Sequence, residues 1–156
     1  MTTYGNLVAS CGEPCPRYFL TDAESGTTTH VRPPAGYSFQ AGYAGAFSPD
    51  GPRLAVAVVA NHGQDRRDYP RYLGRRDFPR WSMALVNIAS GAARVIKAST
   101  VDPVYQAMAW SASGRRVFFN AGRGRIMAYQ RGSARATGFA HLRSEAAKRI
   151  IQMAAP

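Results

Sequence analysis

The chain has 156 residues, 46% of them hydrophobic, which is enough for the core of one globular domain. Its longest uninterrupted apolar run, Leu54 to Ala60, is far shorter than the roughly 20 residues of a membrane-spanning helix, so no membrane span is expected. The formal net charge is +11, and every basic residue except Lys97 and Lys148 is an arginine. This charge reflects either the codon bias of a GC-rich genome or an anionic partner, and both interpretations stay open.

The 10 prolines and 15 glycines are scattered along the chain and interrupt it at short intervals. Few stretches show the 3.6-residue period of an amphipathic helix. This punctuation favours many short strands, and we therefore predict an all-β fold.

The N-terminal segment predicts a hairpin that carries both cysteines. If Val8–Cys11 and Arg17–Leu20 pair, Cys11 and Cys15 face each other across a short turn, and a disulfide is geometrically possible. Two reduced thiols are the alternative, and the sequence does not decide between them. A disulfide would favour the cell envelope, and free thiols leave a cytoplasmic location open. No further cysteine or clustered histidine completes a zinc site.

Two stretches further along the chain echo each other. AGAFSPDGPRLAVAVV begins at Ala44, and AMAWSASGRRVFF begins at Ala107. Each predicts a hairpin turn closed by a glycine with positive φ, at Gly51 and Gly114. We expect Phe47 and Trp110 to occupy equivalent buried positions.

The strand that follows the first of these turns, Leu54 to Val59, is apolar at nearly every position. Such a strand is expected where both faces of a sheet are covered. A second repeated signal is an apolar strand followed by Asp or Asn and then Ser-Gly, in YFLTDAESG and ALVNIASG. There the side chains of Asp22 and Asn87 are expected to bind backbone amides within the turn.

Units of four short strands with these two turns resemble the blades of TolB-type and WD-like β-propellers, whose hallmark is FSPDGxxLA. Here the motif runs from Phe47 to Ala55, and the later copy departs from it at Ala112 and Ser113. The resemblance implies an open partial propeller over residues 1–138, followed by a tail that is helical or irregular. The expected parts are a blade remnant at 6–31 without its first strand, a full blade at 44–98, a blade at 105–138 and the tail at 139–156.

A closed propeller typically has about four to eight blades, so about two and a half blades do not close a ring. We therefore expect a piece of a longer protein, a truncated reading frame, or a protomer that closes a ring with copies of itself. The partners implied are further propeller blades or another protein.

The full blade contains a long insertion at 61–80, in which RRDYPR is followed by RRDFPR. Interleaved arginines and aromatic residues suit an anionic partner such as single-stranded nucleic acid. A solvated loop pinned by its aromatic side chains is the alternative. The candidate binding residues are Arg66, Arg67, Tyr69, Arg71, Tyr72, Arg75, Arg76, Phe78 and Arg80.

No Gly-x-Ser-x-Gly elbow, phosphate-binding glycine-rich loop or His-Glu-x-x-His motif occurs in the sequence. We therefore expect no catalytic residue, metal ligand or cofactor, and a non-catalytic binding or scaffolding module. Two alternatives stay open: a polyanion-binding module that works through residues 66–80, and the propeller part of a larger hydrolase.

Overall fold

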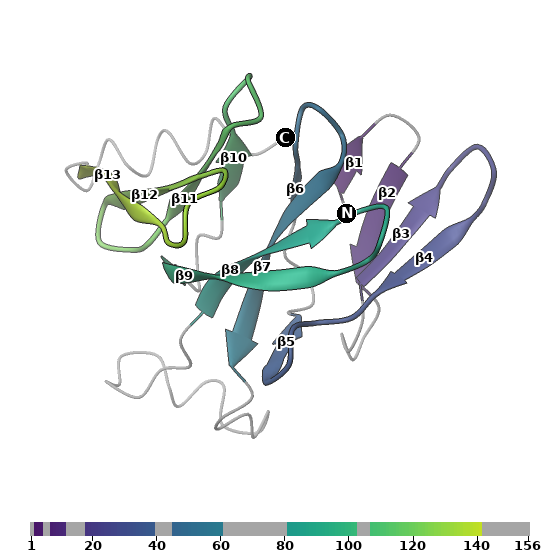
Figure 1. Ribbon diagram of the computed structural model, residues 1–156, viewed down its shortest axis with the longest axis horizontal. Helices are drawn as coiled ribbons and strands as arrows, with labels where there is room; N and C mark the ends of the chain where they lie inside the picture. Colours follow the sequence, from purple (N-terminus) through teal and green to yellow (C-terminus); the bar gives the residue numbers. More distant parts are fainter. Residues whose placement is uncertain are drawn as a thin grey trace.

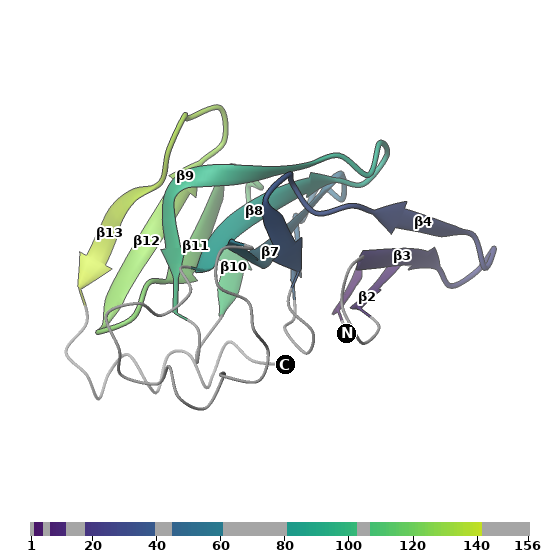
Figure 2. The ribbon, with the colours of Figure 1, turned by 90° about the horizontal axis from the view of Figure 1, so that it is seen from below.

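The computed structural model describes residues 2–4, 7–11, 18–39, 45–60, 81–102 and 107–141, with side chains from residue 19 onward. All the regular elements in these ranges are β-strands, and they form three antiparallel sheets. Figures 1 and 2 show these sheets following one another in chain order, with the middle sheet between its two neighbours. The all-β prediction is confirmed.

The first sheet has four strands in sequence order. They are β1 (Thr2–Tyr4), β2 (Leu7–Cys11), β3 (Tyr18–Asp22) and β4 (Thr28–Val31). The expectation that this blade lacks its first strand is wrong, because β1 pairs with β2 in antiparallel register. The sequence Thr2-Thr3-Tyr4 contains no apolar run and therefore does not by itself predict a strand.

The middle sheet has five strands. Four of them follow the order β5-β7-β8-β9, and the fifth, β6, also pairs with β7. They are β5 (Tyr37–Phe39), β6 (Ala46–Phe47), β7 (Arg53–Ala60), β8 (Trp81–Asn87) and β9 (Ala93–Val101). The sheet begins before residue 44 because β5 pairs with the far end of β7, where Tyr37 lies opposite Ala60. It also runs past residue 98, to Val101.

The third sheet again has four strands in sequence order. They are β10 (Met108–Trp110), β11 (Arg116–Asn120), β12 (Arg125–Gln130) and β13 (Thr137–His141). Its last strand extends past residue 138, so the first residues assigned to the tail belong to this sheet. Residues 142–156, where the helical tail was predicted, lie outside the described residues.

The two predicted Gly-ended turns have the same hydrogen bonds. Gly51 N donates to Ser48 O at 2.9 Å, and Gly114 N donates to Ser111 O at 2.9 Å. The serine hydroxyls also accept equivalent bonds, from Arg53 N at 3.1 Å and from Arg116 N at 3.0 Å. The φ angles are 85° at Gly51 and 64° at Gly114, a region that favours glycine. The echo in the sequence is therefore a structural repeat.

Phe47 and Trp110 occupy equivalent positions in this repeat. Phe47 pairs with Leu54, and Trp110 pairs with Val117. Both aromatic side chains are half-buried, however, so the expectation of full burial is wrong. Their strands β6 and β10 each have a sheet neighbour on one side only, which leaves part of each ring exposed at the edge.

The second repeated turn is confirmed as well. Ser25 N donates to Asp22 Oδ1 at 2.8 Å, and Ser90 N donates to Asn87 Oδ1 at 3.1 Å. The backbone of each turn is closed by a glycine amide, with Gly26 N bound to Asp22 O and Gly91 N bound to Asn87 O. The carboxylate and the amide thus perform the same local task in two blades.

The middle sheet is buried on both faces. One face joins the third sheet through a cluster that includes Met83, Phe119 and Tyr129. The other face joins the first sheet through a cluster that includes Leu20 and Leu54. The two-sided burial of Leu54 to Val59, predicted from their unbroken apolar sequence, is confirmed.

Candidate binding surfaces

Polar bonds cross the seam between the middle and third sheets. The indole Nε1 of Trp110 donates to Ala46 O at 2.8 Å, which ties β10 to β6. Nη1 of Arg131 lies 3.2 Å from Oδ2 of Asp50, so the β12–β13 turn meets the β6–β7 turn. These contacts set the position of the third sheet relative to the middle one.

A bulge in β9 supplies a further link across this seam. Ala98 has a φ of 55°, and the Ser99 hydroxyl donates to Ile96 O at 2.6 Å and accepts from Met83 N at 2.9 Å. The distorted strand turns its backbone toward the third sheet, where Lys97 O accepts from Ala136 N at 2.9 Å. No pattern in the sequence singled out this bulge.

The outer face of the third sheet, on the side away from the middle sheet, is the first candidate surface. Strand alternation places Phe118, Ile126 and Ala128 on this face, opposite the buried Val117, Phe119 and Tyr129. Phe139 stands at a register shift between β12 and β13, and its ring meets that of Phe118 with centroids 4.7 Å apart. Phe139 is 56% exposed, whereas the large apolar side chains of the core clusters are buried. This outer face therefore presents the exposed ring of Phe139 and the half-buried side chains of Phe118 and Ile126, while Ala128 is buried.

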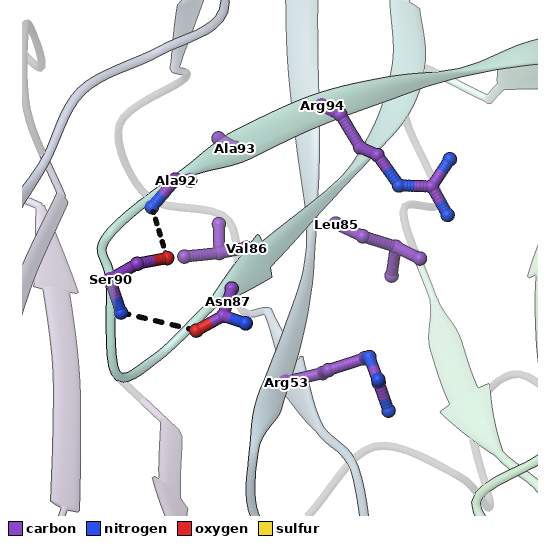
Figure 3. A pocket seen from close by; sticks show the side chains of 8 residues that line it. All are labelled: Arg53, Leu85, Val86, Asn87, Ser90, Ala92, Ala93 and Arg94. Atoms are coloured by element: carbon purple, nitrogen blue, oxygen red, sulfur yellow. Dashed lines mark hydrogen bonds between the residues drawn. The ribbon is translucent and has the colours of Figure 1, made fainter.

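A pocket of about 360 Å³ is the second candidate surface (Figure 3). It lies where β7, β8 and β9 approach the Asn87 turn, and its polar lining includes Arg53, Asn87, Ser90 and Arg94. Backbone and side-chain atoms of Leu85, Val86, Ala92 and Ala93 complete the wall. A volume of this size is within the range of small-molecule sites in proteins.

The two arginines of this pocket differ in their contacts. Nη2 of Arg94 donates to Oη of Tyr129 at 2.6 Å, so the third sheet orients this guanidinium. Nη1 of Arg53 lies 3.9 Å from Oδ2 of Asp50, beyond hydrogen-bond length. The Ser48 hydroxyl, together with Arg131 and Arg53, holds the pKa of the Asp50 carboxyl below its usual value of 3.8.

The residues predicted to bind an anionic partner, from Arg66 to Arg80, all lie outside the described residues. The possible disulfide is not tested, because Cys15 and the side chain of Cys11 lie outside the described residues. The hairpin that carries these cysteines is formed by β2 and β3, with Cys11 opposite Tyr18 in the ladder. The pocket residues Arg53, Asn87 and Arg94 were not identified as a site, since they come from three separate strand ends.

The described residues contain no group of three or more His, Cys, Asp or Glu side chains placed to hold a metal ion. No helix in this part of the chain is long and apolar enough to cross a membrane.

No protein-family model matches the sequence, and no curated protein sequence matches it. Solved structures do. TolB from Acinetobacter baumannii is 14% identical, with a TM-score of 0.52, over 85% of this chain and 29% of that protein. A protein of unknown function from Bacteroides thetaiotaomicron is 16% identical, with a TM-score of 0.52, over 91% of this chain and 30% of that protein.

The chain thus spans less than a third of the length of either similar structure. At these identities the likeness concerns the fold alone. It agrees with the three antiparallel sheets, their repeated turns and the absence of ring closure among them. The chain is an open partial β-propeller made of three blades.

Proposed function

We propose that this chain is a non-catalytic segment of a TolB-type β-propeller that acts as a binding or scaffolding module. Its principal contact surface is the outer face of the third sheet, and the partner is a further propeller blade. The single observation that supports this proposal is the exposed apolar character of that face, with Phe139 56% exposed.

The middle sheet shows how one blade packs on the face of another in this protein. Both of its faces are covered by neighbouring sheets through apolar side chains. The third sheet repeats the Gly-ended turn of the middle sheet, and the described core cluster covers its inner face. A fourth blade stacked in the same manner would cover Phe118 and Phe139 and would repeat the existing relation.

Sedimentation velocity over a range of concentrations tests this proposal. The isolated chain is expected to self-associate through the exposed face, and Phe139→Lys is expected to weaken that association because it places a charge there. Ala134→Lys is the matched control, because it adds the same charge at an exposed position in the turn between β12 and β13. A parent chain that stays a compact monomer at every concentration would contradict the proposal.

The charge distribution favours a second candidate function, the binding of a polyanion through residues 66–80. Asp50 and Asp102 are the acidic residues among the described residues of the middle and third sheets from residue 45 onward. The charged residues of 107–141 are all arginines. This positive environment would strengthen attraction of a polyanion to the adjoining arginine-rich segment.

Salt-dependent binding of heparin and single-stranded DNA tests this second function. Replacement of Arg66, Arg67, Arg75 and Arg76 by Gln is expected to weaken binding. It should also reduce the slope of log affinity against log salt by about 0.7 to 0.9 for each lost phosphate contact. Equal affinity and equal slope in the parent and this variant would rule out residues 66–80 as the binding site.

A further inference from the structure

The pocket at the Asn87 turn presents hydrogen-bond donors without a matching acidic group. Asn87 Oδ1 already accepts the Ser90 amide at 3.1 Å, which leaves the amide nitrogen of the side chain to donate. Figure 3 shows this nitrogen turned toward the side on which the guanidinium groups of Arg53 and Arg94 lie. None of the described residues that line the pocket is acidic.

The environment of Arg53 adds to this excess of donors over acidic groups in the pocket. Its side chain is 26% exposed, and its Nη1 atom is buried without a hydrogen-bond partner among the described residues. Burial of a charged donor without a hydrogen bond is unfavourable, and the partly exposed remainder of the Arg53 side chain lines the pocket. Asp50, the nearest carboxylate, is 3.9 Å away and is engaged by Arg131 at 3.2 Å.

Arg94 is placed for the same role. Its Nη2 atom is held by Tyr129, and the guanidinium carries further N–H groups that point from a fixed position. A planar fork held in this way is suited to bidentate contact with the oxygens of a carboxylate or phosphate. Arg53, Asn87 and Arg94 therefore form three donor groups around one cavity of about 360 Å³.

We propose that this pocket binds a small oxyanion, the phosphate or carboxylate group of a small molecule. The anion would accept hydrogen bonds from Arg53 and Arg94 and from the amide nitrogen of Asn87. None of the lining residues belongs to the outer face of the third sheet or to residues 66–80, so the proposal rests on neither proposed function.

Asn87→Asp is the most direct test. The equivalent turn of the first sheet uses Asp22, whose Oδ1 accepts from Ser25 N at 2.8 Å, so an aspartate at position 87 preserves the turn. The substitution removes the amide donor and adds a negative charge to the pocket. Titration calorimetry with inorganic phosphate and with citrate is expected to show affinity at least about tenfold weaker than in the parent, since bonds to charged groups are strong.

Arg53→Gln provides a second variant, which removes a guanidinium without adding a negative charge. Arg116→Gln is its matched control: it makes the same charge change at an exposed arginine that binds Gln130 at 2.7 Å and lies outside the pocket. We expect Arg53→Gln to weaken anion binding and Arg116→Gln to leave it unchanged. Thermal unfolding of each variant shows whether it is folded under the conditions of the titration.

The two probes also identify the anion. Saturable binding of phosphate alone would indicate a phosphate ester, and binding of citrate alone would indicate a carboxylate ligand. Either result supports the proposal if Asn87→Asp and Arg53→Gln weaken the binding of that anion. The absence of saturable binding to the parent, or equal affinity in the parent and folded Asn87→Asp, would overturn it.

Discussion

The two faces of the middle sheet join their neighbours in different ways. Toward the first sheet, the middle sheet packs through an apolar cluster that includes Leu20, Val31 and Leu54. Toward the third sheet, a similar apolar cluster is supplemented by directed bonds, among them Trp110 Nε1 to Ala46 O. Apolar burial is non-directional, whereas a hydrogen bond requires a defined geometry. Apolar burial therefore stabilises the packing of both neighbouring sheets, and the polar bonds define how the third sheet is aligned.

The two faces of the third sheet give the largest expected difference in stability. Phe119 is 1% exposed in the seam with the middle sheet, and Phe139 is 56% exposed on the outer face. Phe119→Ala is expected to lower the free energy of unfolding by about 3 to 5 kcal/mol, because it leaves a cavity in a packed core.

Phe139→Ala is the matched control for this prediction. It is expected to change the free energy of unfolding by less than about 0.5 kcal/mol in the monomer, as for most surface substitutions. Urea denaturation measures both variants. Similar losses in the two would show that the outer face is covered in the isolated chain.

Trp110→Phe tests the directed bonds of the seam with an intermediate expected effect. The substitution keeps an aromatic ring, as at the equivalent residue Phe47, but removes the donor to Ala46 O. We expect the free energy of unfolding to fall by about 1 kcal/mol, the typical contribution of one hydrogen bond.

Arg116→Ala is the control for Trp110→Phe, because it removes an exposed hydrogen bond to Gln130 that lies within the third sheet. It is expected to change the free energy of unfolding by less than about 0.5 kcal/mol. If Trp110→Phe were as stable as the parent in urea denaturation, the indole bond would have no part in aligning the two sheets.

Asp50→Asn has the smallest expected effect, and its signature is pH dependence. The pKa of the Asp50 carboxyl is held below 3.8 by Ser48, Arg131 and Arg53. The folded state therefore gains stability from ionised Asp50 at pH values above 3.8, and this gain is lost as the pH falls through the lower pKa of the folded state. The urea midpoints of the parent and Asp50→Asn are expected to differ at about pH 6, and this difference is expected to shrink as the pH falls below 3.8. A constant difference across this range would show that the carboxylate charge does not strengthen the seam.

Local features were predictable from the sequence because their causes are local. The turns at Gly51 and Gly114 follow from residues that adopt the required φ angles, and the Asp22 and Asn87 turns follow from side chains that bind nearby amides. The burial of β7 on both faces was predictable from its unbroken apolar sequence.

Features that depend on distant contacts were not predictable in this way. The strand β1 forms through its pairing with β2, because Thr2-Thr3-Tyr4 alone has no distinct pattern. The bulge at Ala98 is maintained by Ser99 and by the contact of Lys97 with Ala136. The pocket forms only when Arg53 and Arg94 are brought beside Asn87 by the ladder of the middle sheet. One signal is present in the sequence: Asn87 stands where the equivalent turn has Asp22, so its Oδ1 still accepts the turn amide while an NH2 donor replaces the second carboxylate oxygen.

Hydrogen exchange in the monomer distinguishes the middle sheet, which is covered on both faces, from the third sheet, which is covered on one. Strands β8 and β12 are a matched pair, since each lies between two strands of its own sheet. The account predicts that β8 amides exchange only through global unfolding, while β12 amides exchange faster through partial opening of the third sheet. Equal protection of β8 and β12 in the monomer would contradict it.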